Sequence, residues 1–282
     1  MRLLIEKIKL AILKRTGVSQ QKKNYDTWVA KGYRKEPMVT FIIQSHNKSL
    51  QICHILPKLR QYKDAEIIVI DDGSSLDHTE RLAKELKGAN EFLLRSNDLF
   101  ENVTYDKAIR LSNGKYIALM QDDDDFDGIA WVEKAVALFQ CHPKMVVLGG
   151  KDGLDIVFEK DKQKAHGGKA IKGDIFTFVT SVNRAPMWIN RVLFMQHLRH
   201  IDFRFAPFQF DDYELCIRAW LTGLQVGLYN AAFRSLTAGG MRIWNSEFTR
   251  EQSHRNSLLL YQLYADRQEE LRKILNSQIN DV

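Results

Sequence analysis

Apolar and polar residues alternate in blocks along most of the chain. Runs of apolar β-formers predict buried strands at 38–47, 65–75, 91–96 and 115–125. Apolar residues at helical spacing predict helices between and after them, at 50–62, 77–88, 103–114 and 128–139. Continuous apolar strands that alternate with helices are typical of a parallel sheet covered on both faces. We therefore expect an α/β fold with a Rossmann-like, mostly parallel mixed sheet and helices on both faces.

The helix predicted at 77–88 has the clearest end signals. Asp77 is a suitable N-cap, Glu80 stands three residues later as in a capping box, and Gly88 can end the helix. Near the C-terminus, the spacing of apolar residues at 253–275 predicts one long amphipathic helix, suited to packing or self-association.

Polar and acidic residues stand at the ends of three of the predicted strands. These ends read QSHN at 44–47, DDGSS at 71–75 and QDDDD at 121–125. Ligands of open α/β sheets bind at the carboxyl ends of the strands, where such side chains meet. The pattern favours an active site at this edge of the sheet.

Four consecutive aspartates, residues 122–125, follow the apolar run YIALM. Two carboxylates about 4 Å apart repel each other by roughly 4 kcal/mol at an effective dielectric constant near 20. The cluster therefore needs either open water or a cation. It is either a solvated acidic turn or a metal site.

The composition fits a globular chain with an uneven distribution of charge. Its 282 residues are 45% hydrophobic and 27% charged, enough to bury one large core or two small ones. The net charge is +6, but residues 1–35 contain ten Lys or Arg against only Glu6 and Asp26. The rest of the chain is therefore slightly acidic, which argues against nucleic acid as a partner.

Residues 1–36 form a separate basic segment. Within 1–17, apolar residues recur at helical spacing between lysines and arginines, and no uncharged apolar run exceeds four residues. The segment is therefore predicted to be a basic amphipathic helix, and neither a signal peptide nor a spanning helix. Two alternatives stay open: the helix packs on the body or on a partner, or it lies on an anionic membrane surface.

The three cysteines, Cys53, Cys141 and Cys216, are far apart and odd in number. This usage suits a reducing compartment, with thiols as small core residues, and provides no zinc framework. We expect the protein in the cytoplasm, with peripheral contact to the inner membrane face as the alternative that the basic segment leaves open.

Four motifs appear in an order and spacing typical of one family. They are TFIIQSHN, IIVIDDGSS, AIRLSNGKYIALMQDDDD and FDDYELCIRAW. Together they resemble the inverting family 2 glycosyltransferases with a GT-A fold, over residues 38–245. The resemblance implies a GT-A domain at 37–245, with a nucleotide-sugar half at 37–125 and an acceptor half at 126–245. A helical extension at 246–282 would follow it.

The resemblance also implies a reaction. The chain would move a sugar from a nucleotide-diphosphate donor, with UDP-sugars favoured, to a hydroxyl of a glycan or lipid-linked saccharide in surface polysaccharide synthesis. A Mn²⁺ or Mg²⁺ ion would neutralise the leaving diphosphate. Two alternatives remain: a catalytically degenerate GT-A protein that binds nucleotide or sugar without turnover, and a nucleotidyltransferase.

The resemblance assigns residues of the donor half to roles. Asp123 matches the metal-binding Asp of the family, and Gln121 stands where an Asp is usual. Asp124 and Asp125 remain as candidates to cap the following helix. Asp71 has the alternative of fixing the turn after its strand. The donor-binding residues would be Ser45, Asn47, Asp71, Asp72, Gln121 and Asp122.

The acceptor half receives its roles in the same way. Asp212 matches the general base and Asp211 a group that orients it, with a helix N-cap as the alternative for this pair. Trp188 would stack on an acceptor sugar, or pack in the core. Arg184 and Arg191 would pair with phosphate, or with a carboxylate across a loop. The neutral Gln121, and the lack of the His that some relatives present near residues 233–242, weaken the expected affinity for a cation.

Overall fold

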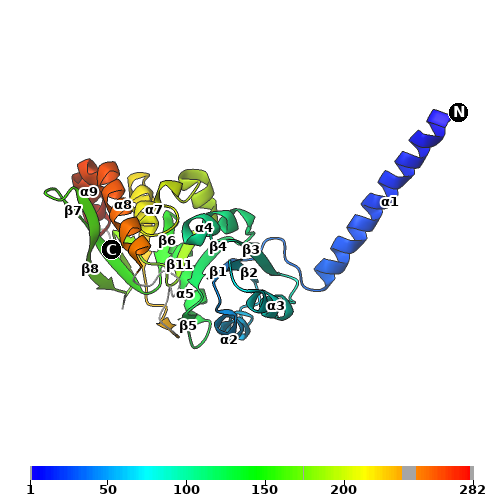
Figure 1. The fold of residues 1–282 in the computed structure, drawn as a ribbon, viewed down its shortest axis with the longest axis horizontal. Coiled ribbons are helices and arrows are strands. Elements are labelled where there is room, and N and C mark those ends of the chain that lie inside the picture. The colour runs from blue at the N-terminus through cyan, green and yellow to red at the C-terminus, as the bar shows by residue number, and fades with distance from the viewer. Residues whose placement is uncertain (1, 174, 237–245, 280–282) are drawn as a thin grey trace.

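The core of the protein is an eight-stranded sheet. The computed structural model describes residues 2–173, 175–236 and 246–279. The strands lie in the order β3-β2-β1-β4-β11-β6-β12-β9 (Figure 1). Their bounds are β1 Val39–Ser45, β2 Ala65–Asp72, β3 Glu91–Ser96, β4 Tyr116–Gln121, β6 Met145–Gly149, β9 Thr177–Phe178, β11 Met187–Asn190 and β12 Gln225–Leu228.

Most strand pairs in this sheet are parallel. The pairs β1–β2, β2–β3, β1–β4 and β6–β12 are parallel, whereas β11 runs antiparallel to β4 and β6, and β9 antiparallel to β12. The prediction of a mostly parallel mixed sheet is therefore confirmed. Among the predicted strands, 91–96 coincides with β3.

Helices cover both faces of the sheet. Apolar side chains of α2, α3 and α5 pack on one face, and those of α4 and α7 on the other. The bounds of the main helices are α2 Ser49–Leu59, α3 Leu76–Glu85, α4 Phe100–Leu111, α5 Ala130–Cys141 and α7 Asp211–Leu221; the one-turn helix α6 spans Arg191–Leu193. The predicted cap of α3 was wrong, because Ser75, whose hydroxyl donates to Asp77, precedes the first helical residue.

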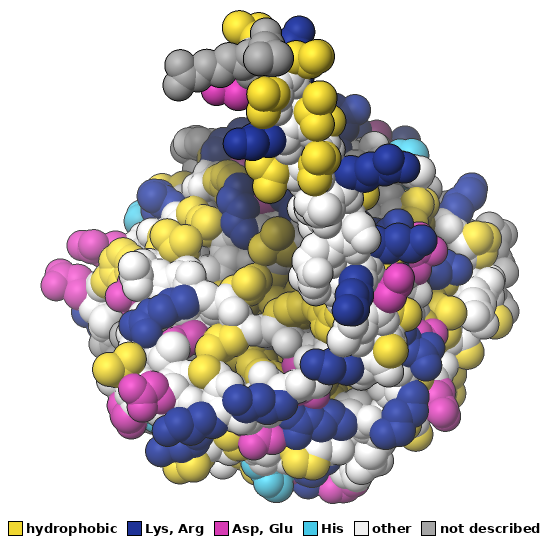
Figure 2. Space-filling view, turned by 90° about the vertical axis from the view of Figure 1, so that its right-hand side faces the viewer, with side chains coloured by type: hydrophobic (Ala, Val, Ile, Leu, Met, Phe, Trp, Pro, Cys, Tyr) yellow, Lys and Arg dark blue, Asp and Glu magenta, His cyan; other side chains and the backbone are white. Residues whose placement is uncertain are grey.

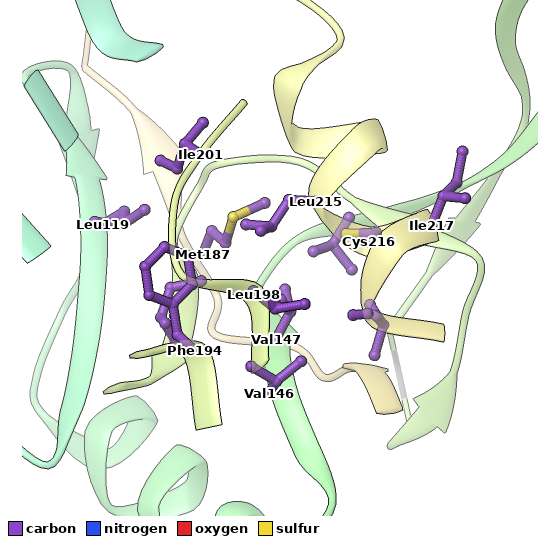
Figure 3. Close-up of a cluster of buried hydrophobic side chains, with 14 of the residues drawn as sticks. Leu119, Val146, Val147, Met187, Phe194, Leu198, Ile201, Leu215, Cys216 and Ile217 are labelled. Atoms are coloured by element: carbon purple, nitrogen blue, oxygen red, sulfur yellow. The ribbon is translucent and has the colours of Figure 1, made fainter. Parts of the chain in front are cut away.

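The core of the second half lies between the sheet and α7 (Figure 3). Side chains from β6, β11 and α7 meet there, and Cys216 is one of them. Cys216 is the only one of the three cysteines that is fully buried, whereas Cys53 is half-buried and Cys141 is exposed. The expectation that all three thiols are core residues was therefore wrong for Cys141.

Two smaller sheets flank the main one. The first has the order β10-β7-β8 and the second pairs β13 with β5. Their strands are β5 Asp124–Asp125, β7 Asp152–Glu159, β8 Lys164–Lys172, β10 Ser181–Val182 and β13 Arg234–Ser235.

The C-terminal part forms two helices where one was predicted. They are α8, Glu247–Tyr264, and α9, Gln268–Ile279, and a 3₁₀ turn at Ala265–Arg267 separates them. The break allows α8 to pack on β8 while α9 packs on α7 and β9. The domain boundary predicted at residue 245 lies outside the described residues.

The N-terminal helix α1, Arg2–Ala30, projects away from the body (Figure 1). Its apolar side chains face solvent, with Leu3 73% and Leu13 67% exposed. Leu3 and Ile5 lie on nearly opposite sides, because two residues turn an α-helix by about 200°. The helix is therefore not amphipathic in the predicted one-sided sense. Its C-terminal end contacts the body, where the Trp28 ring lies 6.2 Å from the Phe92 ring of β3. None of the described helices is long and apolar enough to cross a membrane.

Candidate active site

The carboxyl ends of β1, β2 and β4 lie side by side, as predicted for the edge of the sheet. β1 is the central strand of the three, with Ser45 opposite Asp71 and Gln44 opposite Gln121. The acidic ends of β2 and β4 therefore lie on either side of the polar end of β1.

Asp72 is enclosed at this edge. Its carboxylate accepts hydrogen bonds from the Gln44 side chain, the Ser96 hydroxyl and the backbone N–H groups of Leu99 and Phe100, at 2.7–3.0 Å. The side chain is fully buried. In this conformation it anchors the segment between β3 and α4, and a nucleobase would reach it only after some of these bonds open.

The other predicted donor residues of β1 and β2 link the strand ends to one another. Asp71 is fully buried and accepts a short hydrogen bond from the Thr79 hydroxyl, so it fixes α3 against β2. Asn47 has a left-handed backbone, with φ 57°, and its side-chain oxygen accepts from the Ser75 N–H at 2.9 Å. The hydroxyl of Ser45 is buried, and no other described residue forms a hydrogen bond with it.

Asp122, the first of the four aspartates, has a cation from elsewhere in the chain. One of its oxygens lies 3.1 Å from the Lys48 ammonium, and the other accepts from the His46 N–H at 3.0 Å. Burial raises the pKa of Asp122, and the hydrogen bond and Lys48 oppose that shift. Lys48 lies one residue beyond the motif TFIIQSHN, so reading that motif alone misses it.

Asp124 and Asp125 do not cap the next helix, which corrects the sequence expectation. They form β5, and α5 begins only at Ala130. Burial raises the pKa of Asp124 to about 7, although it accepts the Gln121 N–H. Burial also disfavours the charge on Asp125, but hydrogen bonds from Lys58 and Arg234 outweigh it and lower its pKa.

Asp123 is left as the candidate metal ligand. Its carboxylate has no hydrogen bond or ion pair with any described residue, and the residue is only 5% exposed. Among the described residues, no three His, Cys, Asp or Glu side chains are grouped so that they could hold a metal ion. A divalent cation fits here only as a partial site, with Asp123 as its protein carboxylate and other oxygens from a bound ligand. Most of the stretch 233–242, noted for its lack of His, lies outside the described residues.

Asp211 and Asp212 begin α7 and lie beside Arg184. The Arg184 guanidinium forms a short ion pair with Asp211 and stacks 5.2 Å from the centre of the Tyr105 ring. Asn102 also donates to Asp211, at 3.2 Å. Arg184 therefore pairs with a carboxylate across a loop, which was one of its two predicted uses.

Asp212 has the properties of a proton acceptor near neutral pH. Burial raises the pKa of Asp212 to about 6; Arg184 lowers it and the neighbouring Asp211 raises it further. Neither aspartate is the residue that precedes α7, because that residue is Phe210, whose side chain makes no cap hydrogen bond. Asp212, inside the first turn, accepts the N–H of Tyr213 at 2.9 Å. The N-cap alternative was therefore wrong about the position of the pair, although Asp212 satisfies one N–H group of the first turn.

One cavity connects the end of β4 with the start of α7. It has a volume of about 480 Å³. It is lined by residues from the strand ends and from the start of α7, including Gln121, Lys151, Arg184, Asp211, Asp212 and Tyr213. Its carboxylates, arginine and lysine suit a polar, hydroxyl-rich ligand. The sequence analysis predicted four of these six as site residues and missed Lys151 and Tyr213.

Trp188 and Arg191 do not belong to this cavity. Trp188 is fully buried on β11, 5.2 Å from the Trp131 ring, and its N–H donates to the Tyr229 hydroxyl at 3.0 Å. The prediction that it stacks on an acceptor sugar was therefore wrong, and its alternative, core packing, is what the structure shows. Arg191 lies at the opposite end of the sheet, where its N–H donates to the Lys115 carbonyl.

Several solved structures are similar to this chain in fold. The mannosyltransferase PcManGT from Pyrobaculum calidifontis, in complex with GDP-Man and Mn²⁺, has a TM-score of 0.54 and 12% identity over 94% of this chain and 82% of that chain. S. aureus TarS 1–349 in complex with UDP-GlcNAc has a TM-score of 0.60 and 14% identity over 86% and 71%. GalNAc-T7 with UDP, GalNAc and Mn²⁺ has a TM-score of 0.55 and 13% identity over 70% and 43%. At these identities the likeness shows the fold alone.

The sequence itself matches one family. No curated protein matches the chain. Residues 40–203 match the family described as Glycosyl transferase family 2, which is more than half of the chain. The matched region contains the ends of β1, β2 and β4 and stops before Asp211. The chain therefore belongs to glycosyl transferase family 2 and is a glycosyltransferase with a GT-A fold.

Proposed function

We propose that the protein transfers a sugar from a nucleoside-diphosphate sugar to an acceptor hydroxyl with inversion at the anomeric carbon, and that a divalent cation assists. The observation that carries this proposal is the shared cavity of about 480 Å³, which joins Gln121 at the end of β4 to the Asp211–Asp212 pair. A donor held at the strand ends and an acceptor near α7 would meet there. A UDP-sugar is the favoured donor, as expected from the sequence resemblance.

Asp212 is the general base of the proposed reaction. Its raised pKa, about 6, keeps it largely ionised at pH 7 while making it a stronger base than an ordinary aspartate. It would take the hydroxyl proton of the acceptor as that oxygen forms a bond to the anomeric carbon. The bond from that carbon to the diphosphate oxygen breaks on the opposite face, and the nucleoside diphosphate leaves.

Asp211 and Arg184 form the support of this base. Asp211 neutralises Arg184 and is held by Asn102, so the pair occupies a fixed position beside Asp212. The positive charge of Arg184 stabilises the ionised form of Asp212 against its burial. Ser45, Asn47, Asp71, Asp72, Gln121 and Asp122 remain the proposed donor side, with Asp71 and Asp72 acting mainly through the segments that they anchor.

Asp123 is the proposed protein ligand of Mn²⁺ or Mg²⁺. The ion would supply charge neutralisation at the leaving diphosphate. Asp122 is paired with Lys48 and Gln121 is neutral, so the protein offers few charged ligands. Tight binding would therefore need the diphosphate oxygens. The PcManGT and GalNAc-T7 structures, which contain Mn²⁺ with their nucleotide ligands, support a divalent ion here.

The proposed acceptor is a glycan or lipid-linked saccharide of surface polysaccharide synthesis, and the proposed location is the cytoplasm. Contact of α1 with an anionic membrane would bring the site near a lipid-linked acceptor. Figure 2 shows apolar side chains of α1 facing solvent with basic side chains among them. The basic side chains of α1 would be attracted to the acidic headgroups of such a membrane.

Product analysis tests the proposal. The protein is incubated with a panel of UDP- and GDP-sugars and Mn²⁺, with water as the acceptor, and the released nucleotide is identified. Release of nucleoside diphosphate with a sugar of inverted configuration supports the proposal. Pyrophosphate would instead indicate a nucleotidyltransferase, and tight donor binding without any release would indicate a degenerate binding protein.

A further inference from the structure

The loop in front of the carboxylate pair has an unusual backbone. Gln209 and Phe210, the two residues before Asp211, have φ values of 76° and 67°. Left-handed conformations are disfavoured for residues with a Cβ, and two in succession persist only where surrounding contacts hold them. The direction in which the chain enters α7, and hence the position of Asp211 and Asp212, depends on those contacts.

Asn256 of α8 makes the most direct of these contacts. Its amide nitrogen donates to the backbone carbonyls of Phe205, Phe208 and Gln209, at 2.8, 2.9 and 2.8 Å. The side chain is fully buried. Its oxygen accepts from the Gln252 amide at 3.2 Å. Because the nitrogen faces only acceptors and the oxygen only donors, one orientation of the amide satisfies the site.

Further groups hold the same loop on both sides. From α8, Gln252 and Arg255 both donate to the Ala206 carbonyl. From α4, the Asn102 N–H donates to the Pro207 carbonyl at 3.2 Å, and its side chain reaches Asp211. Rings also meet across the loop, since Phe208 lies 5.2 Å from Phe100 and 5.5 Å from Phe248.

We infer that Asn256 is a positioning residue for the proposed general base, so that the C-terminal helix α8 is part of the catalytic apparatus. It acts through the backbone of residues 205–210 and touches no reacting atom. The inference rests on the proposed role of Asp212 and adds to it a residue that lies outside the family match at 40–203. It assigns a catalytic use to a segment that otherwise serves packing.

Asn256→Asp is the sharpest variant. The aspartate has nearly the same shape, but it places a second acceptor against three carbonyl oxygens and removes the donor. Gln252→Ala is a milder variant that removes one support of Asn256. Ser257→Ala is the matched control, because Ser257 is also buried on α8 but donates to the Ala165 carbonyl of β8, away from the loop.

Amide hydrogen exchange of the full-length variants tests the structural half of the inference. Asn256→Asp should speed exchange in residues 203–212 by at least about tenfold, and Gln252→Ala by a smaller factor. Exchange in β4 should stay at the wild-type rate in both. Equal exchange in Asn256→Asp and Ser257→Ala would overturn the inference, whether or not the protein turns over a donor.

Donor turnover with UDP- and GDP-sugars and Mn²⁺ tests the catalytic half. Asn256→Asp should lower kcat roughly 10- to 100-fold while KM for the donor changes less than about twofold, because misplacement of the base affects the chemical step. Ser257→Ala should keep both constants. The positioning role would be overturned if Gln252→Ala and Ser257→Ala lowered kcat equally. It would also be overturned if a rise in KM for the donor accounted for the whole loss of turnover in Asn256→Asp. If the wild-type chain itself turns over no donor, the proposed function fails, and the exchange measurement still decides whether Asn256 holds the loop.

Discussion

The ammonium of Lys48 lies 3.1 Å from the carboxylate of Asp122, and the two side chains are only 8% and 15% exposed. This ion pair connects the end of β1 to the start of the acidic run. It supplies from a distant part of the sequence the positive charge that the four aspartates lack locally. The chain therefore neutralises Asp122 with its own lysine. Asp123 is the carboxylate of the cluster that would bind an external cation.

Removal of Lys48 should destabilise the fold in a pH-dependent way. Lys48→Met leaves Asp122 buried and unpaired, which we expect to lower the free energy of unfolding by about 3 kcal/mol at pH 8. The loss should be smaller at pH 5, because the raised pKa of Asp122 lets the folded state take up a proton there. Urea unfolding at both pH values measures this. Lys48→Met combined with Asp122→Asn should recover most of the loss, and no recovery would contradict the pairing.

Activity should depend on the ionisation of Asp212. Because its pKa is raised to about 6, kcat/KM should fall below that pH as the carboxylate protonates and can no longer accept a proton. Asp212→Asn should reduce turnover by roughly 10²- to 10⁴-fold while donor binding stays unchanged. The control Asp106→Asn alters another buried carboxylate, on α4, and should leave the midpoint of the pH profile in place. A variant Asp212→Asn with near wild-type turnover would exclude the assigned role.

The four aspartates should separate by function. Asp123→Ala should abolish stimulation by Mn²⁺, since this carboxylate is the one without a partner among the described residues. Asp125→Ala should retain that stimulation but lower the free energy of unfolding by about 1–3 kcal/mol, because it breaks the links to Lys58 and Arg234. The measurement is donor turnover against added Mn²⁺ after treatment with chelator. Full activity in excess chelator would contradict the metal assignment.

Asp124 should make stability fall as pH rises. Its folded-state pKa is about 7, well above that of an ordinary aspartate, so between about pH 4 and pH 7 the folded state holds a proton that the unfolded chain has lost. The free energy of unfolding therefore decreases as pH rises through this window. Asp124→Asn should flatten that dependence and stabilise the protein at pH 8. Thermal unfolding from pH 5 to 8 tests it, and an unchanged profile would show that Asp124 ionises normally.

Deletion of residues 1–23 should separate membrane contact from catalysis. The deleted stretch has seven Lys or Arg against one acid and lies on the exposed part of α1, whereas Trp28 keeps its stacking contact with Tyr33. Attachment to anionic liposomes should weaken, because each basic residue near the surface contributes about 1 kcal/mol. Turnover of soluble donor should not change. Equal and salt-insensitive liposome binding of both forms would contradict the membrane proposal.

Local pattern predicted four of the eight strands in the main sheet, β1 to β4, because each of these has its own apolar run. Residues 91–96, for example, form β3 as expected, and the acidic ends of β2 and β4 lie at the same edge of the sheet, on either side of β1. Partners across the chain could not be predicted in this way. Lys48 and Asp122 are 74 positions apart, and only the strand order brings them together.

The same limit explains the errors at single residues. Trp188 has the right chemistry for stacking on a sugar, but β11 enters the sheet between β4 and β6 and encloses it. Asp125 has the right chemistry for a helix cap, but Lys58 and Arg234 hold it in β5. Side-chain type therefore indicated what each residue could do, and the tertiary arrangement selected among the options.

The contact between Asn256 and the loop at 205–209 also has a consequence for biosynthesis. A ribosome that adds 5–20 residues per second needs about 2–9 s to travel from Asp211 to Asn256. During that interval the Rossmann-like half can already fold, but the strained turn before α7 has nothing from α8 to hold it. On our proposal, a nascent or prematurely terminated chain would carry its nucleotide-binding edge without a working base, and turnover would begin only after α8 has left the ribosome and docked.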